Sequence, residues 1–146
     1  MPATRRSAAR GHVSGTLTLA GFLAVGVGAA LGAWLRWWLG VALNPVFPTL
    51  PYGTLAANLT GGYLVGVAVA YFGHHTGLPP EVRLFAITGF LGGLTTFSTF
   101  SAEIVSLVAR AQYAWALAAA SAHLLGSLFA TSLGIVTVSL LRRVWV

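Results

Sequence analysis

Residues 89–103 have the sequence GFLGGLTTFSTFSAE and lie within an apolar run long enough to cross a bilayer. Each of the three glycines in this stretch weakens a helix by about 1 kcal/mol relative to alanine. Five hydroxyl side chains lie within seven residues, from Thr95 to Ser101. In hydrocarbon, irregular backbone survives only inside protein or beside a cavity. The stretch therefore predicts either a tight helix crossing or a broken helix whose freed main-chain groups hold an ion.

The composition of the whole chain indicates a membrane protein. Of its 146 residues, 57% are hydrophobic and only 7% are charged, whereas soluble domains have roughly 25% charged residues. The formal net charge is +6, and the arginines that supply it lie at the ends of apolar segments or near the N-terminus. This placement favours membrane orientation and lipid headgroups over nucleic acid as the reason for the charge. Without cysteine, the chain has no disulfide and no thiolate chemistry.

The N-terminal region is predicted to be a disordered basic tail. Residues 1–14 carry Arg5, Arg6 and Arg10 among small residues. A signal peptide is the alternative, since a basic region followed by an apolar run is typical of one. However, the apolar run continues to Trp38 instead of stopping at a cleavage site. We therefore expect a tail.

The remainder, residues 15–146, is predicted to be a single all-α membrane domain. Polar or proline-rich connections separate four apolar segments, each longer than the ~20 residues needed to cross a bilayer. Short connections favour an up-and-down helical bundle. Four helices enclose little space, so polar residues on several of them indicate assembly into at least a dimer. The predicted spans are about 17–43, 52–73, 82–110 and 115–141.

Two of the predicted helices carry polar residues in register. Thr54 and Asn58 lie one turn apart in the second span, and His123, Ser127 and Thr131 recur every four residues in the fourth. Both sets could simply join helices through hydrogen bonds. Asparagine within a membrane span is costly, however, and such residues commonly mark a functional site.

The chain has no recognisable catalytic constellation, so we do not expect an enzyme. Its only acidic residues are Glu81 and Glu103, and it contains neither a phosphate-binding glycine motif nor HExxH. What remains is a track of amide and hydroxyl donors, which suits a small anion without supplying a charge that would trap it. The residues of this track are Thr54, Asn58, Ser98, Ser127 and Thr131.

Phe97 and Phe100 lie three residues apart and so share one helix face. Core packing would explain such a pair. An aromatic ring also has a positive edge, so two rings presented edge-on could solvate a small, poorly polarisable anion.

Three segments closely resemble the signature of the Fluc (CrcB) fluoride channel family. They are residues 92–100 (GGLTTFSTF) with Glu103, residues 28–36 (GAALGAWLR) and residues 53–61 (GTLAANLTG). The similarity extends over roughly residues 21–141, with four spans in the family's order. It implies a fluoride-selective channel of the inner (cytoplasmic) membrane that lowers cytoplasmic fluoride by passive export.

The resemblance also implies an assembly and a set of site residues. It implies an antiparallel, dual-topology dimer with two pores, whose third helix breaks near Gly92–Thr95. A structural Na⁺ at the dimer interface would be held by the main-chain carbonyls of Gly92 and Thr95, since hard cations prefer oxygen ligands. Pore residues by resemblance are Phe97, Phe100, Asn58, Ser98, Thr54, Ser127, Thr131 and His123, and vestibule residues are Arg36 and Glu103.

Two features depart from the family's pattern. His123 stands where the resemblance predicts a tyrosine, and an imidazole could make conduction sensitive to pH. With both termini on one side, six of the eight arginines lie there, and only Arg36 and Arg110 lie opposite. Such a charge bias opposes equal insertion in the two orientations. The partner chain is therefore either an identical copy or an oppositely oriented paralogue. Membrane lipid is the other expected partner.

Two other functions are compatible with four short spans. A small proton-coupled multidrug exporter would have a similar size, but it would need a carboxylate in the first span, where this chain has none. A non-transporting scaffold subunit would explain the faces of small residues, but not the polar stripes.

Overall fold

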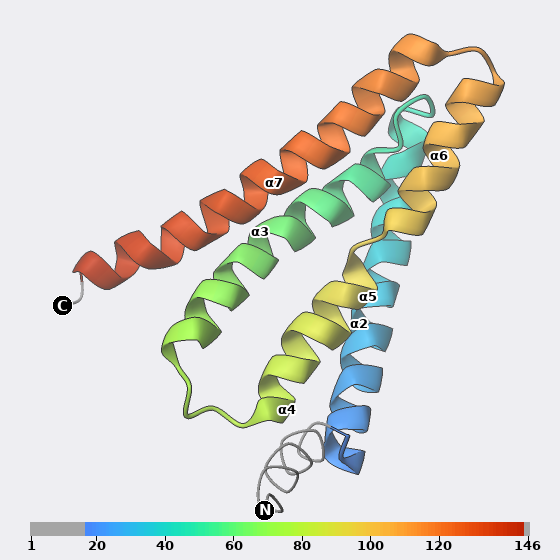
Figure 1. Ribbon diagram of the computed structural model, residues 1–146. Helices are drawn as coiled ribbons and strands as arrows, with labels where there is room; N and C mark the ends of the chain where they lie inside the picture. Colours follow the sequence, from blue (N-terminus) through green and yellow to red (C-terminus); the bar gives the residue numbers. More distant parts are fainter. Residues whose placement is uncertain (1–16, 145–146) are drawn as a thin grey trace, which may run out of the picture.

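The computed structural model describes residues 17–144, and the predicted tail, residues 1–14, lies outside them. Every regular element in this range is helical, as the sequence predicts (Figure 1). The elements are α2 (Leu19–Leu43), η1 (Asn44–Val46), α3 (Tyr52–His74), α4 (Pro80–Arg83), the π-helix η2 (Leu84–Leu91), α5 (Gly92–Leu94), α6 (Phe97–Ala109) and α7 (Tyr113–Val144).

Four of the helical segments are apolar and long enough to cross a membrane, which makes the chain a multi-pass membrane protein. They contain 28, 23, 30 and 32 residues, against the ~20 that a bilayer requires. The segments are Leu19–Val46, Tyr52–His74, Pro80–Ala109 and Tyr113–Val144.

Side chains near the helix ends satisfy main-chain donors there. Thr18 Oγ1 accepts a hydrogen bond from Gly21 N at 3.0 Å at the start of α2. At the start of α3, Asn44 Oδ1 accepts from Gly53 N at 2.8 Å and from Thr54 N at 3.4 Å. Asn44 thus ends one membrane helix and caps the next, which fixes the proline-rich connection between them.

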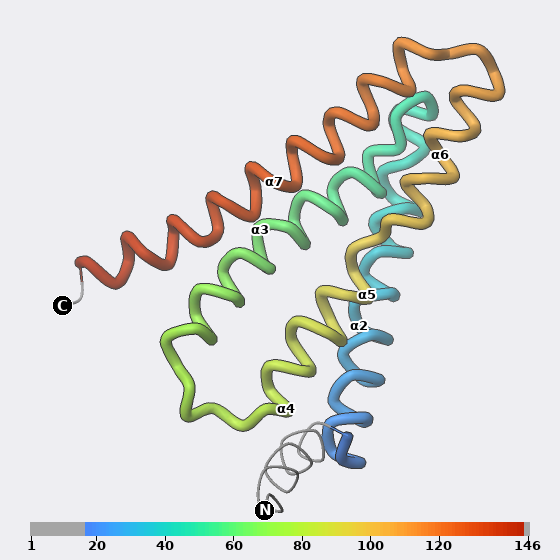
Figure 2. Tube along the Cα trace, viewed as in Figure 1, coloured from blue at the N-terminus to red at the C-terminus, as the bar shows by residue number. Residues whose placement is uncertain are grey.

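The helices pack as two close pairs, α3 with α7 and α2 with the segment formed by α4, η2 and α5 (Figures 1 and 2). Glycines allow this approach. A Cβ on Gly66 would collide with the carbonyl oxygen of Thr131 in α7, and one on Gly32 would collide with that of Phe90 in η2. Small residues at membrane helix interfaces allow backbones to approach closely in this way.

The third membrane segment is broken, which is one of the two alternatives from the sequence, and the break lies at the Thr95 end of the expected range Gly92–Thr95. Gly92 is helical, with φ −64° and ψ −36°. The chain becomes extended at Thr95 (ψ 153°) and Thr96 (φ −147°), and α6 starts immediately afterwards (Figure 2). Gly89 and Gly93 instead serve close packing, because a Cβ on either would meet the backbone of α2.

Much of the outer surface is apolar. Phe22 is 77% exposed, Leu117 71% and Phe129 71%. Such a surface needs lipid or another protein chain to cover it.

Candidate functional site

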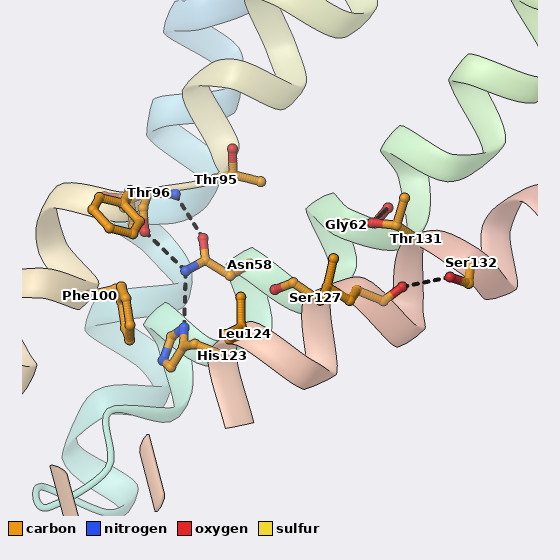
Figure 3. A pocket seen from close by; sticks show the side chains of 12 residues that line it. Asn58, Gly62, Thr95, Thr96, Phe100, His123, Leu124, Ser127, Thr131 and Ser132 are labelled. Carbon is orange, nitrogen blue, oxygen red and sulfur yellow. Dashed lines mark hydrogen bonds between the residues drawn. The ribbon is translucent and has the colours of Figure 1, made fainter. Parts of the chain in front are cut away.

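One side chain satisfies the main chain at the break in the third segment. The amide N–H of Thr96 donates to Asn58 Oδ1 at 2.7 Å, and Asn58 Nδ2 donates to the carbonyl oxygen of Thr96 at 3.0 Å (Figure 3). Buried main-chain groups must be paired. Asn58 Oδ1 therefore gives the Thr96 N–H a partner in place of the Gly92 carbonyl, and Nδ2 adds a bond to the Thr96 carbonyl, which also begins α6.

The break also diverts donors from two carbonyl groups. In a continuous helix the N–H of Thr96 would bond to the Gly92 carbonyl and that of Thr99 to the Thr95 carbonyl. Instead, Thr96 N donates to Asn58, and Thr99 N donates to Thr96 Oγ1 at 3.1 Å. Gly92 and Thr95 thus keep main-chain oxygens without their usual helical donors, and Gly92 is exposed.

Arg36 reaches the same break from α2. Its Nε donates to the carbonyl oxygen of Gly93 at 3.0 Å, so this third carbonyl has a partner. Arg36 also lines a pocket of about 310 Å³ together with Asn44, Thr54 and Thr99. The sequence predicts Arg36 as a vestibule residue; the structure adds a bond to the broken segment that the sequence pattern did not reveal.

A pocket of about 440 Å³ opens beside the break, between α3, α6 and α7 (Figure 3). It brings together six of the eight residues predicted for the pore, from helices far apart in the sequence. The six residues are Asn58, Phe97, Phe100, His123, Ser127 and Thr131.

The two phenylalanines meet edge to face but differ in environment. Their ring centroids lie 5.5 Å apart with an interplanar angle of 60°. Phe97 is 80% exposed, whereas Phe100 packs against His123 with centroids 4.7 Å apart. Phe100 is therefore half-buried against His123, and Phe97 projects outward.

The polar stripe of the fourth span divides into different roles. His123 is buried, and its Nδ1 lies 3.1 Å from Asn58 Nδ2. Thr131 Oγ1 donates to the carbonyl oxygen of Gly62 at 3.0 Å, so this residue joins α7 to α3 through a hydrogen bond. The Ser127 hydroxyl has no hydrogen bond within residues 17–144 and remains available to the pocket.

Thr54 and Ser98, the other two predicted pore residues, do not line this pocket. Thr54 is buried, and its Oγ1 donates to Glu103 Oε1 at 2.5 Å. Glu103 lines a separate pocket of about 270 Å³ with Thr99. Ser98 is exposed, with its hydroxyl 3.3 Å from that of Thr96.

Thr96 is a site residue that the sequence analysis did not single out. It caps α6 through its side chain and binds Asn58 through its main chain. A threonine immediately before an apolar helical segment is a typical N-cap signal, so the residue could have been found from the sequence.

Known proteins resemble this chain over most of its length. A family model described as CrcB-like protein, Camphor Resistance (CrcB), matches residues 23–135. A protein of Nitrosospira multiformis named fluoride-specific ion channel FluC is 69% identical over 120 residues, which cover 82% of this chain and 94% of the relative. A protein of Ralstonia pickettii with the same name is 66% identical over 118 residues, with coverage of 81% and 94%.

Proposed function

Because this chain belongs to the CrcB-like family, we propose that it is a fluoride-selective ion channel that lowers cytoplasmic fluoride by passive export. Its relatives in Nitrosospira multiformis and Ralstonia pickettii are named fluoride-specific ion channels. The observation that carries the proposal is the pocket beside the helix break, where Phe97, Phe100 and Ser127 converge. Neither the multidrug exporter nor the scaffold subunit is favoured by these relatives.

The pocket offers weak binding of a kind that suits conduction. No arginine, lysine, aspartate or glutamate is among the described residues that line it. An anion would meet the positive edges of Phe97 and Phe100 and the hydroxyl of Ser127. Conduction requires binding that is favourable enough for entry and weak enough for release. A fixed positive charge within the pocket would instead retain the ion.

We propose that a structural Na⁺ is held by the carbonyl groups of Gly92 and Thr95. Support comes from the hydrogen bonds at the break, because the N–H groups that a helix would direct at these oxygens go to Asn58 and Thr96. Oxygen ligands are those that a hard cation prefers. The cation would stabilise two copies of the broken segment against each other.

The proposed assembly is an antiparallel, dual-topology dimer with two pores in the inner membrane. Phe97 and Gly92 are both exposed in the single chain, and a second chain would cover them and close the pocket. The partner is an identical copy or an oppositely oriented paralogue, and lipid covers the remaining apolar surface.

Fluoride efflux from liposomes tests the proposed function. Purified protein is reconstituted into vesicles loaded with fluoride, and release is followed with a fluoride electrode while an ionophore dissipates the membrane potential. We expect rapid release of fluoride and little release of chloride from matched vesicles. Equal release of both anions, or release no faster than from protein-free vesicles, would contradict the proposal.

A further inference from the structure

The hydrogen bonds at the break fix the orientation of the Asn58 amide. Its Oδ1 faces the N–H of Thr96, which only donates, and its Nδ2 faces the carbonyl oxygen of Thr96, which only accepts. Turning the amide over would place two donors together at one contact and two acceptors together at the other. The orientation therefore follows from the network rather than from the appearance of the amide.

This orientation in turn fixes the tautomer of His123. Asn58 Nδ2 also lies 3.1 Å from His123 Nδ1, and since an amide nitrogen only donates, Nδ1 must accept. A neutral imidazole then carries its proton on Nε2. Within the described chain, Nε2 is buried and has no hydrogen-bond partner. Leaving such a donor unpaired costs free energy, so local stability alone does not explain this histidine.

We propose that His123 is a positioning residue that acts through Asn58 and keeps the third segment open at Thr96. His123 is only 4% exposed, and its ring is held against Phe100 on one side and Asn58 on the other (Figure 3). Asn58 donates both of its amide hydrogens within the protein, to Thr96 and to His123. Both amide hydrogens thus act at the break in this arrangement. This inference adds a residue role to the proposed function. It depends on that function only in the experiments that measure fluoride flux.

Protonation of His123 would set two donors against each other. Nδ1 would then carry a hydrogen that faces Asn58 Nδ2, and the amide cannot turn over without losing both of its bonds to Thr96. The charged and titratable groups on the elements packed against α7 are few: α6 contributes Glu103, which accepts from Thr54 Oγ1. Those on α3 are Tyr52, Tyr63, Tyr71 and His74.

The tautomer can be measured without any transport assay. Nitrogen-15 NMR of labelled histidine in the detergent-solubilised protein at mildly alkaline pH distinguishes the two neutral forms, and comparison with His123→Asn assigns the signal. We expect His123 to carry its proton only on Nε2, and we expect Asn58→Leu to allow both forms. A proton on Nδ1 in the unmodified protein would overturn the inference whether or not fluoride is conducted.

Fluoride efflux of two variants then tests the positioning role. Asparagine places its Oδ1 close to the position of Nδ1 and can accept the same bond, whereas leucine cannot. We expect His123→Leu to conduct about tenfold less than His123→Asn, which corresponds to the loss of one hydrogen bond. Equal efflux of the two variants, with both dimers folded, would overturn the positioning role.

The pH profile separates this role from simple packing. Efflux of the unmodified protein should fall as the pH is lowered and His123 becomes protonated, after release from protein-free vesicles is subtracted, and His123→Asn should remove most of that fall. A fall retained in full by His123→Asn would contradict the inference. If the tautomer is as expected but no protein conducts fluoride, the proposed function fails while the hydrogen-bond assignment stands.

Discussion

At the scale of single residues, the Asn58 amide ties α3 to the main chain at the break. Its oxygen and nitrogen pair with both main-chain groups of Thr96. An unpaired buried donor costs about 1–3 kcal/mol, and Asn58 Oδ1 removes that cost for the Thr96 N–H, which the break leaves without its helical acceptor. Asn58 is thus the side chain through which α3 determines the backbone of the third segment.

The variant Asn58→Asp tests this role directly. One carboxylate oxygen can still accept from Thr96 N, and His123 can move its proton to Nδ1 and donate to the carboxylate, but the other oxygen would face the Thr96 carbonyl, which only accepts. The bond to that carbonyl is lost and a negative charge is placed beside the pocket, so we expect fluoride efflux to fall by about 30-fold or more, or at least 2 kcal/mol. The initial rate from liposomes measures it, with the dimer verified by gel filtration. Efflux within a factor of two of the unmodified protein would show that the brace is dispensable.

Residue types and spacing singled out six of the residues that line the pocket, but not their partners. Asn58, Phe100 and the stripe from His123 to Thr131 stand out as polar or paired residues in apolar spans, and all of them line the pocket. The bond between Asn58 and Thr96 joins residues 38 apart in the chain. Such a contact depends on how two helices pack, which no local pattern encodes.

At the scale of the elements, the third segment shows where glycine was misinterpreted. The density of glycines and hydroxyls left a tight helix crossing and a broken helix as alternatives, and the segment is broken. Gly92 remains helical, and Gly89 and Gly93 use their lack of a Cβ for contact with α2. The break falls at Thr95 and Thr96, where Asn58 offers alternative hydrogen bonds. The glycine spacing therefore indicated close helix packing. The position of the break depends on α3, whose Asn58 bonds to the main chain of Thr96.

Alanine at selected glycines tests the close packing of α3 with α7. A Cβ on Gly66 would collide with the Thr131 carbonyl oxygen and lie 3.1 Å from Ile135 N, both of them main-chain atoms that cannot move aside easily. We expect Gly66→Ala to destabilise the protein by about 1–3 kcal/mol, seen as a lower thermal unfolding temperature in detergent. Gly26→Ala is the matched control, since nothing lies within 4 Å of its Cβ position; it should be neutral or stabilising. Equal effects of the two variants would refute the packing argument.

At the scale of the whole molecule, the single chain leaves its pocket and much of its apolar surface uncovered. Composition and length predicted four membrane helices, because apolar runs of this length have few other structures available. They could not predict that α3 pairs with α7 and α2 with the third segment, since all four spans are similarly apolar. The exposed Phe97 ring, at 80%, is part of the surface that a second chain would cover.

Removal of Na⁺ tests the proposed cation site at this scale. If carbonyl groups of Gly92 and Thr95 from two chains share one cation, exchange of Na⁺ for a bulky organic cation during purification should shift the dimer toward monomer. Chemical cross-linking or gel filtration measures the dimer fraction, and re-addition of Na⁺ should restore it. A dimer fraction that is independent of Na⁺ would exclude a structural role for the ion.

Fluoride efflux of Phe100→Ile, measured beside Phe129→Ile, tests the central claim that the pocket at the helix break is the path of the anion. Phe100 lines the pocket, whereas Phe129 is 71% exposed and lies outside it. Isoleucine keeps the apolar character but removes the positive ring edge. With both variants folded and assembled like the unmodified protein, we expect Phe100→Ile to lose nearly all fluoride efflux and Phe129→Ile to conduct like the unmodified protein. Undiminished efflux through Phe100→Ile would contradict it.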